Sequence, residues 1–225
     1  MIALVDYGAG NLRSVQNALD TLGAESVIAS TPDGLMHADA IIFPGVGAAA
    51  PAMAALRARG LDRALRDAIR EGRPFLGICL GLQLLFDSSA EDGATCLGIF
   101  QGTVDRLATT EKLPHIGWNT LERVANHPVL AGLEREAMYF VHSYVGVPQD
   151  RQLEAAETTY GVTFVSAIAA GSMIAVQFHP ERSGSAGLRL LGNFVRFALV
   201  RPPTPALPHK GGRRTHVAQA DHSLP

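Results

Sequence analysis

The sequence predicts an α/β protein with a mostly parallel central sheet, helices on both faces and an added β-rich meander. Three observations lead to this prediction. In the first half, short apolar runs alternate with stretches of helical periodicity, which is typical of parallel sheets. Between residues 99 and 174, β-rich runs separated by turn residues take over. After Val200 the chain becomes rich in Pro and Gly, so we expect one domain at residues 1–200 and a disordered tail at 201–225.

The first half consists of strand–helix units. The apolar runs that indicate buried strands are residues 2–5, 27–29, 40–43 and 75–78. Helical periodicity covers residues 12–22, 61–69 and 80–86. Gly23 follows the first helix and Gly72 the second, and glycine commonly ends helices. Strand–helix alternation of this kind predicts a parallel sheet with helices on both faces.

The second half predicts a different arrangement. Its β-rich runs are residues 104–107, 139–145, 153–159 and 162–168, and they form a meander that joins the same sheet or lies beside it. A strand at 173–178 and a helix at 188–199 close the domain. The tail carries three histidines, His209, His216 and His222, which we expect to be solvated rather than metal ligands.

Composition excludes several classes of protein. The 225 residues hold 19 Lys+Arg against 21 Asp+Glu, so there is no basic field for nucleic acid. Two cysteines are too few for a disulfide framework. The most apolar stretch, 40–56, contains Pro44 and Pro51 and does not suit a membrane helix. We therefore expect a cytoplasmic protein with reduced thiols, no cofactor and no metal.

The sharpest chemical signal is G-I-C-L-G at residues 77–81, between a predicted strand and a predicted helix. This is the strand–turn–helix context of a nucleophile elbow, with sulfur in place of a hydroxyl. The positive end of the following helix would favour the thiolate of Cys79. The alternative is that Cys79 is a small buried apolar residue, which is the role we expect for Cys96.

A thiol nucleophile needs a base, and the base needs an orienting partner. His179 and Glu181 follow the late strand and are two residues apart, so in an extended segment they share a face. His179 would take the thiol proton and Glu181 would hold its tautomer. The alternative is that H-P-E is an ordinary loop.

The third component is P-G-V-G at residues 44–47, after a buried strand. It is flexible enough to present the backbone amides of Val46 and Gly47, which with the amide of Leu80 would form an oxyanion hole. The alternative is an ordinary turn at the end of a strand.

Taken together, the motifs resemble class I (triad) glutamine amidotransferases. P-G-V-G, G-I-C-L-G-L-Q-L-L-F at 77–86 and F-H-P-E at 178–181 occur in that family's order and roughly its spacing. Many relatives carry P-G-G where this chain has P-G-V-G. The likeness covers residues 1 to about 199 and implies a glutaminase with Cys79, His179 and Glu181 as its triad.

Further segments resemble the glutaminase subunits of imidazole glycerol phosphate synthases. They are V-D-Y-G-A-G-N-L at 5–12, L-P-H-I-G-W-N at 113–119, Y-F-V-H-S-Y at 139–144 and Q-F-H-P-E-R-S at 177–183. The resemblance implies that ammonia from glutamine passes to a cyclase subunit with a (β/α)8 barrel, in a heterodimer. The joint products are imidazole glycerol phosphate and aminoimidazole carboxamide ribotide, in histidine biosynthesis.

The resemblance also implies roles for further residues. Glutamine would be held by Gly47, Gln83, Glu91, Ser143 and Tyr144. The cyclase would be contacted by Asn11, Trp118, Asn119, Tyr139 and Arg182, although packing in the core is an alternative for Trp118. The family's glutaminase is weak until its partner binds a ligand, and rotation of the Val46 amide into the oxyanion hole is a candidate switch.

Three other functions stay open. One is a related amidotransferase that feeds another synthase. The second is a cysteine hydrolase or deglycase-like enzyme, which would use an elbow thiol without the late H-P-E. The third is a silent binding subunit, which has no reason to keep Cys79, His179 and Glu181 together.

Overall fold

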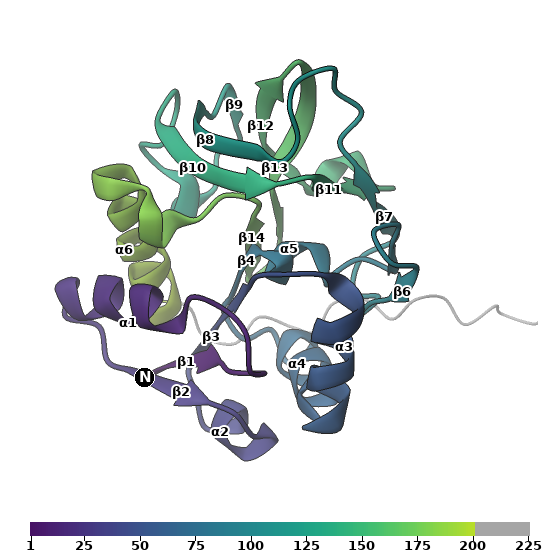
Figure 1. The fold of residues 1–225 in the computed structure, drawn as a ribbon. Helices are drawn as coiled ribbons and strands as arrows, with labels where there is room; N and C mark the ends of the chain where they lie inside the picture. Colours follow the sequence, from purple (N-terminus) through teal and green to yellow (C-terminus); the bar gives the residue numbers. More distant parts are fainter. Residues whose placement is uncertain (201–225) are drawn as a thin grey trace, which may run out of the picture.

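The computed structural model describes residues 1–200 and has the predicted α/β architecture (Figure 1). A large mixed sheet runs through the molecule, with helices on both faces and β-rich segments at one end. The predicted tail, 201–225, lies outside the described residues. Among the helices of residues 1–200, none is long and apolar enough to cross a bilayer.

The central sheet has eight strands. In spatial order they are β2 (Ser26–Ala29), β1 (Ile2–Val5), β3 (Ala40–Gly45), β4 (Phe75–Cys79), β14 (Met173–Val176), β13 (Val162–Ala170), β12 (Glu154–Tyr160) and β9 (Arg123–Val124). The first five are parallel, and each pair from β14 onward is antiparallel. The sheet is therefore mostly parallel, and its antiparallel part comes from the second half of the chain.

The meander is divided between the main sheet and two smaller ones. A two-stranded sheet pairs β10 (Ala137–His142) with β8 (His115–Thr120). A four-stranded sheet has the order β11 (Tyr144–Pro148), β7 (Gly102–Arg106), β5 (Ser88–Ser89) and β6 (Ala94–Thr95). The single predicted run 139–145 is thus two strands separated by Ser143, and each strand joins a different sheet.

Helices cover the two faces of the parallel strands and enclose two apolar cores. One face carries α1 (Leu12–Thr21) and α6 (Gly184–Val200), and the other carries α2 (Pro32–Met36), α3 (Ala49–Ala58) and α4 (Leu61–Arg70) (Figure 1). Alternate residues of β1 point to opposite sides, because successive strand residues do so. Ile2 and Leu4 join the core under α1 and α6, and Ala3 and Val5 join the other.

Two further predicted elements differ from the structure. The strand predicted as buried at 27–29 is β2, the edge strand, where Val27 and Ile28 are 37% and 45% exposed. The helix predicted at 80–86 is α5 (Leu80–Gln83) and ends three residues early. Backbone amides of residues 97–100 bond the carbonyls of Leu84, Leu85 and Phe86, so the chain beyond Gln83 serves a tertiary contact instead.

Aromatic side chains join the two-stranded sheet to the main one. Phe140 of β10 packs edge-on against Phe164 and Phe178, and its ring stacks on His115. All four side chains are buried. Phe178 lies directly beside His179, so this cluster supports the segment that carries the predicted base.

We predict that Phe140→Ala lowers the free energy of unfolding by about 3–5 kcal/mol, because it removes a fully buried ring from a packed cluster. Urea denaturation followed by circular dichroism measures this loss. Leu199→Ala is the control: its side chain is 77% exposed, so the change should stay within about 0.5 kcal/mol. Equal losses in the two variants would contradict the packing role.

Candidate active site

Cys79 is the last residue of β4 and the N-cap of α5, and its backbone is strained. Its φ of 56° and ψ of −109° are unusual for a side-chain-bearing residue, which is typical of a nucleophile elbow. The flanking glycines permit this turn. A Cβ on Gly77 would lie 2.9 Å from the Cβ of Ala175, and one on Gly81 would overlap the carbonyl oxygen of Phe43. Glycine is thus required two residues before and two residues after Cys79, because neighbouring atoms approach the backbone closely at both positions.

Sheet register brings three distant segments to one edge. Gly45, at the end of β3, pairs with Cys79, and Val176, at the end of β14, pairs with Ile78. The carboxyl ends of these parallel strands therefore meet, as at ligand sites of other open α/β sheets. The loop after β3, the elbow and the segment after β14 form one continuous site.

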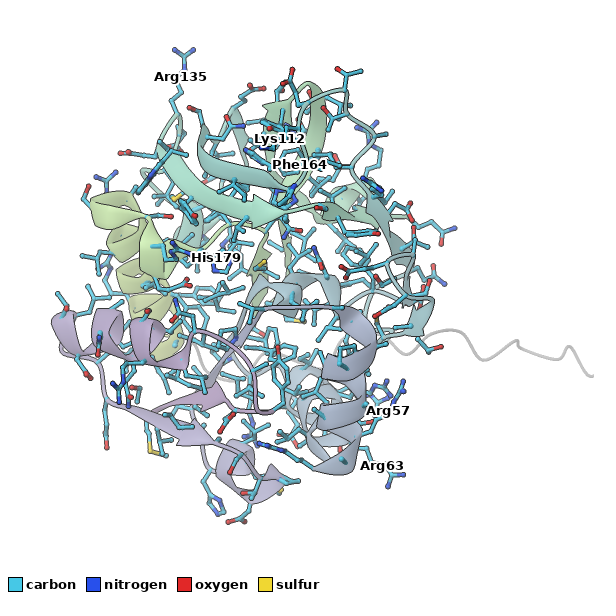
Figure 2. All side chains as sticks on the ribbon, viewed as in Figure 1. Arg57, Arg63, Lys112, Arg135, Phe164 and His179 are labelled. Carbon is cyan, nitrogen blue, oxygen red and sulfur yellow. The ribbon has the colours of Figure 1, made fainter. Side chains whose placement is uncertain are left out.

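His179 and Glu181 lie together in the interior. His179 Nδ1 is 2.9 Å from Glu181 Oε1, and the two side chains are only 4% and 1% exposed. Figure 2 shows His179 within the molecule, whereas Arg57, Arg63 and Arg135 project outward. The local conformation differs from the extended one we predicted: Pro180 starts a 3-10 turn, η3 (Pro180–Arg182), and this turn brings the carboxylate back to the ring.

The charge state of His179 follows from its neighbours. Burial by itself lowers the pKa of His179, but its interactions with Cys79 and Glu181 outweigh burial and raise the pKa to about 10. Its Nε2 completes no conventional hydrogen bond within residues 1–200. Catalytic hydrogen bonds are often long in unliganded sites and tighten when substrate binds. At neutral pH the His179 imidazole is therefore protonated and places a positive charge beside the sulfur.

A cavity of about 430 Å³ opens beside the sulfur. Cys79, His179 and Leu80 line it together with the loop residues Val46 and Gly47. The residues that we expected to hold glutamine also line it: Gly47, Gln83, Glu91, Ser143 and Tyr144. Burial, followed by the negative charge of Asp92, raises the pKa of Glu91, and a cationic ligand group would relieve that repulsion.

The residues expected to face a cyclase lie near the triad but differ in exposure. Trp118 is 57% exposed, which removes the alternative of core packing, and its ring meets Tyr139 edge-on at 6.1 Å. The guanidinium of Arg182 lies 4.2 Å from the centre of the Tyr139 ring. Asn11 Nδ2 is 3.5 Å from Glu181 Oε1. The side chain of Asn119 points inward and donates to the carbonyl oxygen of Thr159.

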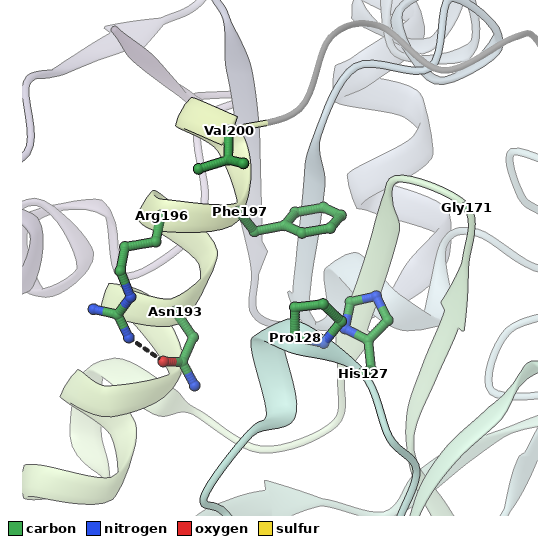
Figure 3. A pocket seen from close by; sticks show the side chains of 7 residues that line it. All are labelled: His127, Pro128, Gly171, Asn193, Arg196, Phe197 and Val200. Atoms are coloured by element: carbon green, nitrogen blue, oxygen red, sulfur yellow. Dashed lines mark hydrogen bonds between the residues drawn. The ribbon is translucent and has the colours of Figure 1, made fainter.

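A second cavity, of about 580 Å³, lies away from this chemistry (Figure 3). It is formed where the last turns of α6 meet η1 (Pro128–Leu130) and the turn at Gly171. Arg196 donates to Asn193 at its rim. No residue predicted for the active site lines it, so its size alone does not make it the functional cavity.

Sequence reasoning missed three buried polar residues at the site, Gln177, His142 and His115. Gln177 donates to the Cys79 sulfur at 3.6 Å, and His142 lines the cavity and bonds His115 at 3.2 Å. The available signal was their place within the segments Q-F-H-P-E, F-V-H-S-Y and L-P-H-I-G-W-N. A polar residue inside an apolar strand is buried only with partners.

We predict that Glu181→Gln lowers the pKa of His179 by about one unit or more, because the imidazolium loses its buried counter-charge. NMR of labelled histidine measures the titration midpoint directly. Glu136→Gln is the control, since Glu136 pairs only with Arg189 on the surface among the described residues. An unchanged midpoint in Glu181→Gln would contradict the electrostatic role.

Comparisons with known proteins agree with this geometry. The family model for class-I glutamine amidotransferases matches residues 3–197. A Dehalococcoides mccartyi (strain CBDB1) protein named imidazole glycerol phosphate synthase subunit HisH is 50% identical over 201 residues, covering 88% of this chain and 98% of that protein. The Arabidopsis thaliana protein named imidazole glycerol phosphate synthase hisHF, chloroplastic, is 47% identical over 200 residues, covering 87% of this chain but 34% of its own length.

Solved structures agree on the fold. A crystal structure described as glutamine amidotransferase superposes with a TM-score of 0.71 at 23% identity, covering 89% of this chain and all of that one. At such identity the likeness supports the fold alone, whereas the family model spans nearly all the described residues. The fold and the family that the sequence predicted are thus confirmed, and the chain belongs to the class-I glutamine amidotransferases.

Proposed function

We propose that this protein is the glutaminase subunit of an imidazole glycerol phosphate synthase. One observation carries the proposal: Cys79 and the His179–Glu181 pair line or adjoin a single cavity in a chain that is 50% identical to such a subunit. The reaction is the hydrolysis of glutamine to glutamate and ammonia. We place it in the cytoplasm, where a reactive thiol stays reduced.

In the first step, the thiolate of Cys79 attacks the side-chain amide carbon of glutamine and forms a carbon–sulfur bond. The carbonyl electron pair moves to oxygen, where the amides of Leu80, Val46 and Gly47 would stabilise it. The His179 imidazolium then gives its proton to the amide nitrogen, so that the carbon–nitrogen bond breaks and ammonia leaves. A γ-glutamyl thioester remains, and His179 is neutral.

In the second step, neutral His179 accepts a proton from water as the water oxygen attacks the thioester. Collapse of the second tetrahedral intermediate breaks the carbon–sulfur bond and releases glutamate. The thiolate and the imidazolium are thereby restored. Glu181 holds the ring with Nδ1 directed at its carboxylate.

Substrate binding would use the remaining cavity residues. Glu91 would pair with the α-ammonium group of glutamine, which relieves its repulsion from Asp92. Ser143, Tyr144 and the backbone of Gly47 line the same space and would contact the rest of the amino acid. Leu80 and Cys79 are buried, so the reacting amide would be held away from water.

The partner would be a cyclase subunit with a (β/α)8 barrel, in a heterodimer. Many relatives are named as subunits of this synthase, and the Arabidopsis hisHF protein is nearly three times the length of the matching segment. The exposed ring of Trp118, stacked edge-on with Tyr139 and followed by Arg182, forms a contact surface beside the triad. Asn11 would contribute from α1's N-terminus, and Asn119 through the position of Trp118.

A glutaminase assay with and without the partner tests the function. Ammonia release should rise sharply when a barrel cyclase and its ribonucleotide are added, because the partner would complete the oxyanion hole. Cys79→Ala should abolish glutamine-dependent synthesis while synthesis from free ammonia persists. No stimulation by this cyclase, with stimulation by the synthase of another pathway, would instead identify a related amidotransferase.

The Gly47 backbone offers a test of the candidate switch. Its φ of +88° is disfavoured for residues with side chains, although no atom lies within 4 Å of its Cβ position. We predict that Gly47→Val suppresses partner-stimulated turnover by about tenfold or more with little change in glutamine binding. Stimulated and basal rates, with glutamine affinity from calorimetry, measure this; undiminished stimulation would reject the switch.

A further inference from the structure

The side chain of Gln177 contacts the nucleophilic sulfur directly. Its Nε2 lies 3.6 Å from Sγ of Cys79, and the residue is completely buried. The contact follows from the register of the sheet, in which Val176 pairs with Ile78. Gln177 directly follows Val176, and Cys79 directly follows Ile78, so these two residues lie side by side. Register therefore sets this amide beside the sulfur, at the start of the segment that carries His179.

Hydrogen bonds fix which end of the amide faces the sulfur. The carbonyl oxygen of Tyr144 can only accept, so the nitrogen of the Gln83 amide points to it at 2.9 Å. The same nitrogen lies 3.1 Å from Oε1 of Gln177 and donates there as well. Gln177 must therefore turn its oxygen to Gln83 and its N–H group to Cys79.

The Tyr144 carbonyl is itself held by a second donor. His142 Nδ1 lies 3.0 Å from it and must carry the proton, so its Nε2 accepts from His115 Nδ1 at 3.2 Å. Nε2 of His115 in turn accepts from the Asn119 amide at 3.4 Å. Burial lowers the pKa of His142 to about 3, so this donor stays neutral and correctly protonated at physiological pH. Every bond in the network has one possible direction.

We propose that Gln177 is a further catalytic residue, whose amide donates a hydrogen bond to the Cys79 thiolate in a direction fixed by Gln83 and the Tyr144 carbonyl. A donor to the charged form favours thiolate over thiol, and the same bond stabilises the thiolate when it leaves the thioester. The proposal deepens the proposed function, because it rests on Cys79 as the nucleophile of the glutaminase.

The role differs from that of the titratable groups around the sulfur. His179 exchanges protons with the reacting atoms, Glu181 holds His179, and Tyr7 contributes a buried phenol beside the site. Gln177 does not titrate. Its contribution is a fixed dipole, so it is present at every stage of the cycle.

The test is the pH dependence of Cys79 alkylation by iodoacetamide, without glutamine, in Gln177→Met and Gln177→Glu. Mass spectrometry quantifies the Cys79 peptide apart from that of buried Cys96. Gln177→Met should move the midpoint of labelling up by about one pH unit, which is about tenfold slower labelling below the midpoint. Gln177→Glu should move it further, because a carboxylate still accepts from Gln83 but places negative charge beside the sulfur.

Two further variants test the direction of the bond. Gln83→Met leaves Gln177 in place but removes the group that orients it, so the midpoint should lie between those of wild type and Gln177→Met. Ser166→Ala is the matched control, since it removes a buried hydroxyl from the strand whose carbonyl bonds the Gln177 backbone, without touching the sulfur. Its labelling curve should match wild type.

Wild-type midpoints in both Gln177 variants would overturn the proposal, as would an equal shift in Ser166→Ala. If Gln177→Met fails to fold, Gln177→Glu and Gln83→Met decide by the same criterion. Because labelling needs neither glutamine nor a partner, a shifted midpoint in a protein that releases no ammonia would refute the proposed function and leave this interaction standing.

Discussion

The register of three parallel strands is the constraint on which the site depends. Because β3, β4 and β14 end at the same edge of the sheet, the Val46 loop, the Cys79 elbow and the segment from Gln177 to Glu181 meet there. A slip of one residue would turn alternate side chains to the opposite face and separate sulfur from imidazole. The two apolar cores on either side of the sheet hold this register, so packing far from the site maintains its geometry.

The electrostatics of the site follow from the burial of charged side chains. Burying His179 and Glu181 together costs desolvation, and such pairs often add little to stability. Here the interactions with Cys79 and Glu181 keep the imidazole protonated, and in the proposed mechanism that proton goes to the departing amine. The nearby His142–His115 pair is neutral instead, because burial keeps both imidazoles uncharged. Its role is to donate hydrogen bonds in a fixed direction. Two kinds of histidine within one site thus have distinct roles.

Sequence patterns predicted the α/β class, the family and the segments that meet at the site, because apolar periodicity and glycine spacing are local. They predicted less where contacts between distant segments determine the local structure. The helix after Cys79 is short because the backbone amides of residues 97–100 bond the carbonyls that follow it. Strand β2 is exposed because it lies at a sheet edge. The His179–Glu181 contact forms through a 3-10 turn rather than an extended strand. The Q-F-H-P-E segment contains Gln177, but no local pattern shows the direction of its amide, which depends on the Tyr144 carbonyl and Gln83.

The wide separation of the reacting groups along the chain has a consequence for biosynthesis. During synthesis, Cys79 leaves the ribosome a hundred residues before His179, and His179 leaves it before helix α6, which packs against its segment. An incomplete nascent polypeptide therefore lacks the counter-ion, the amide dipole and the final layer of packing. The site can therefore assemble only after synthesis has passed His179 and completed helix α6.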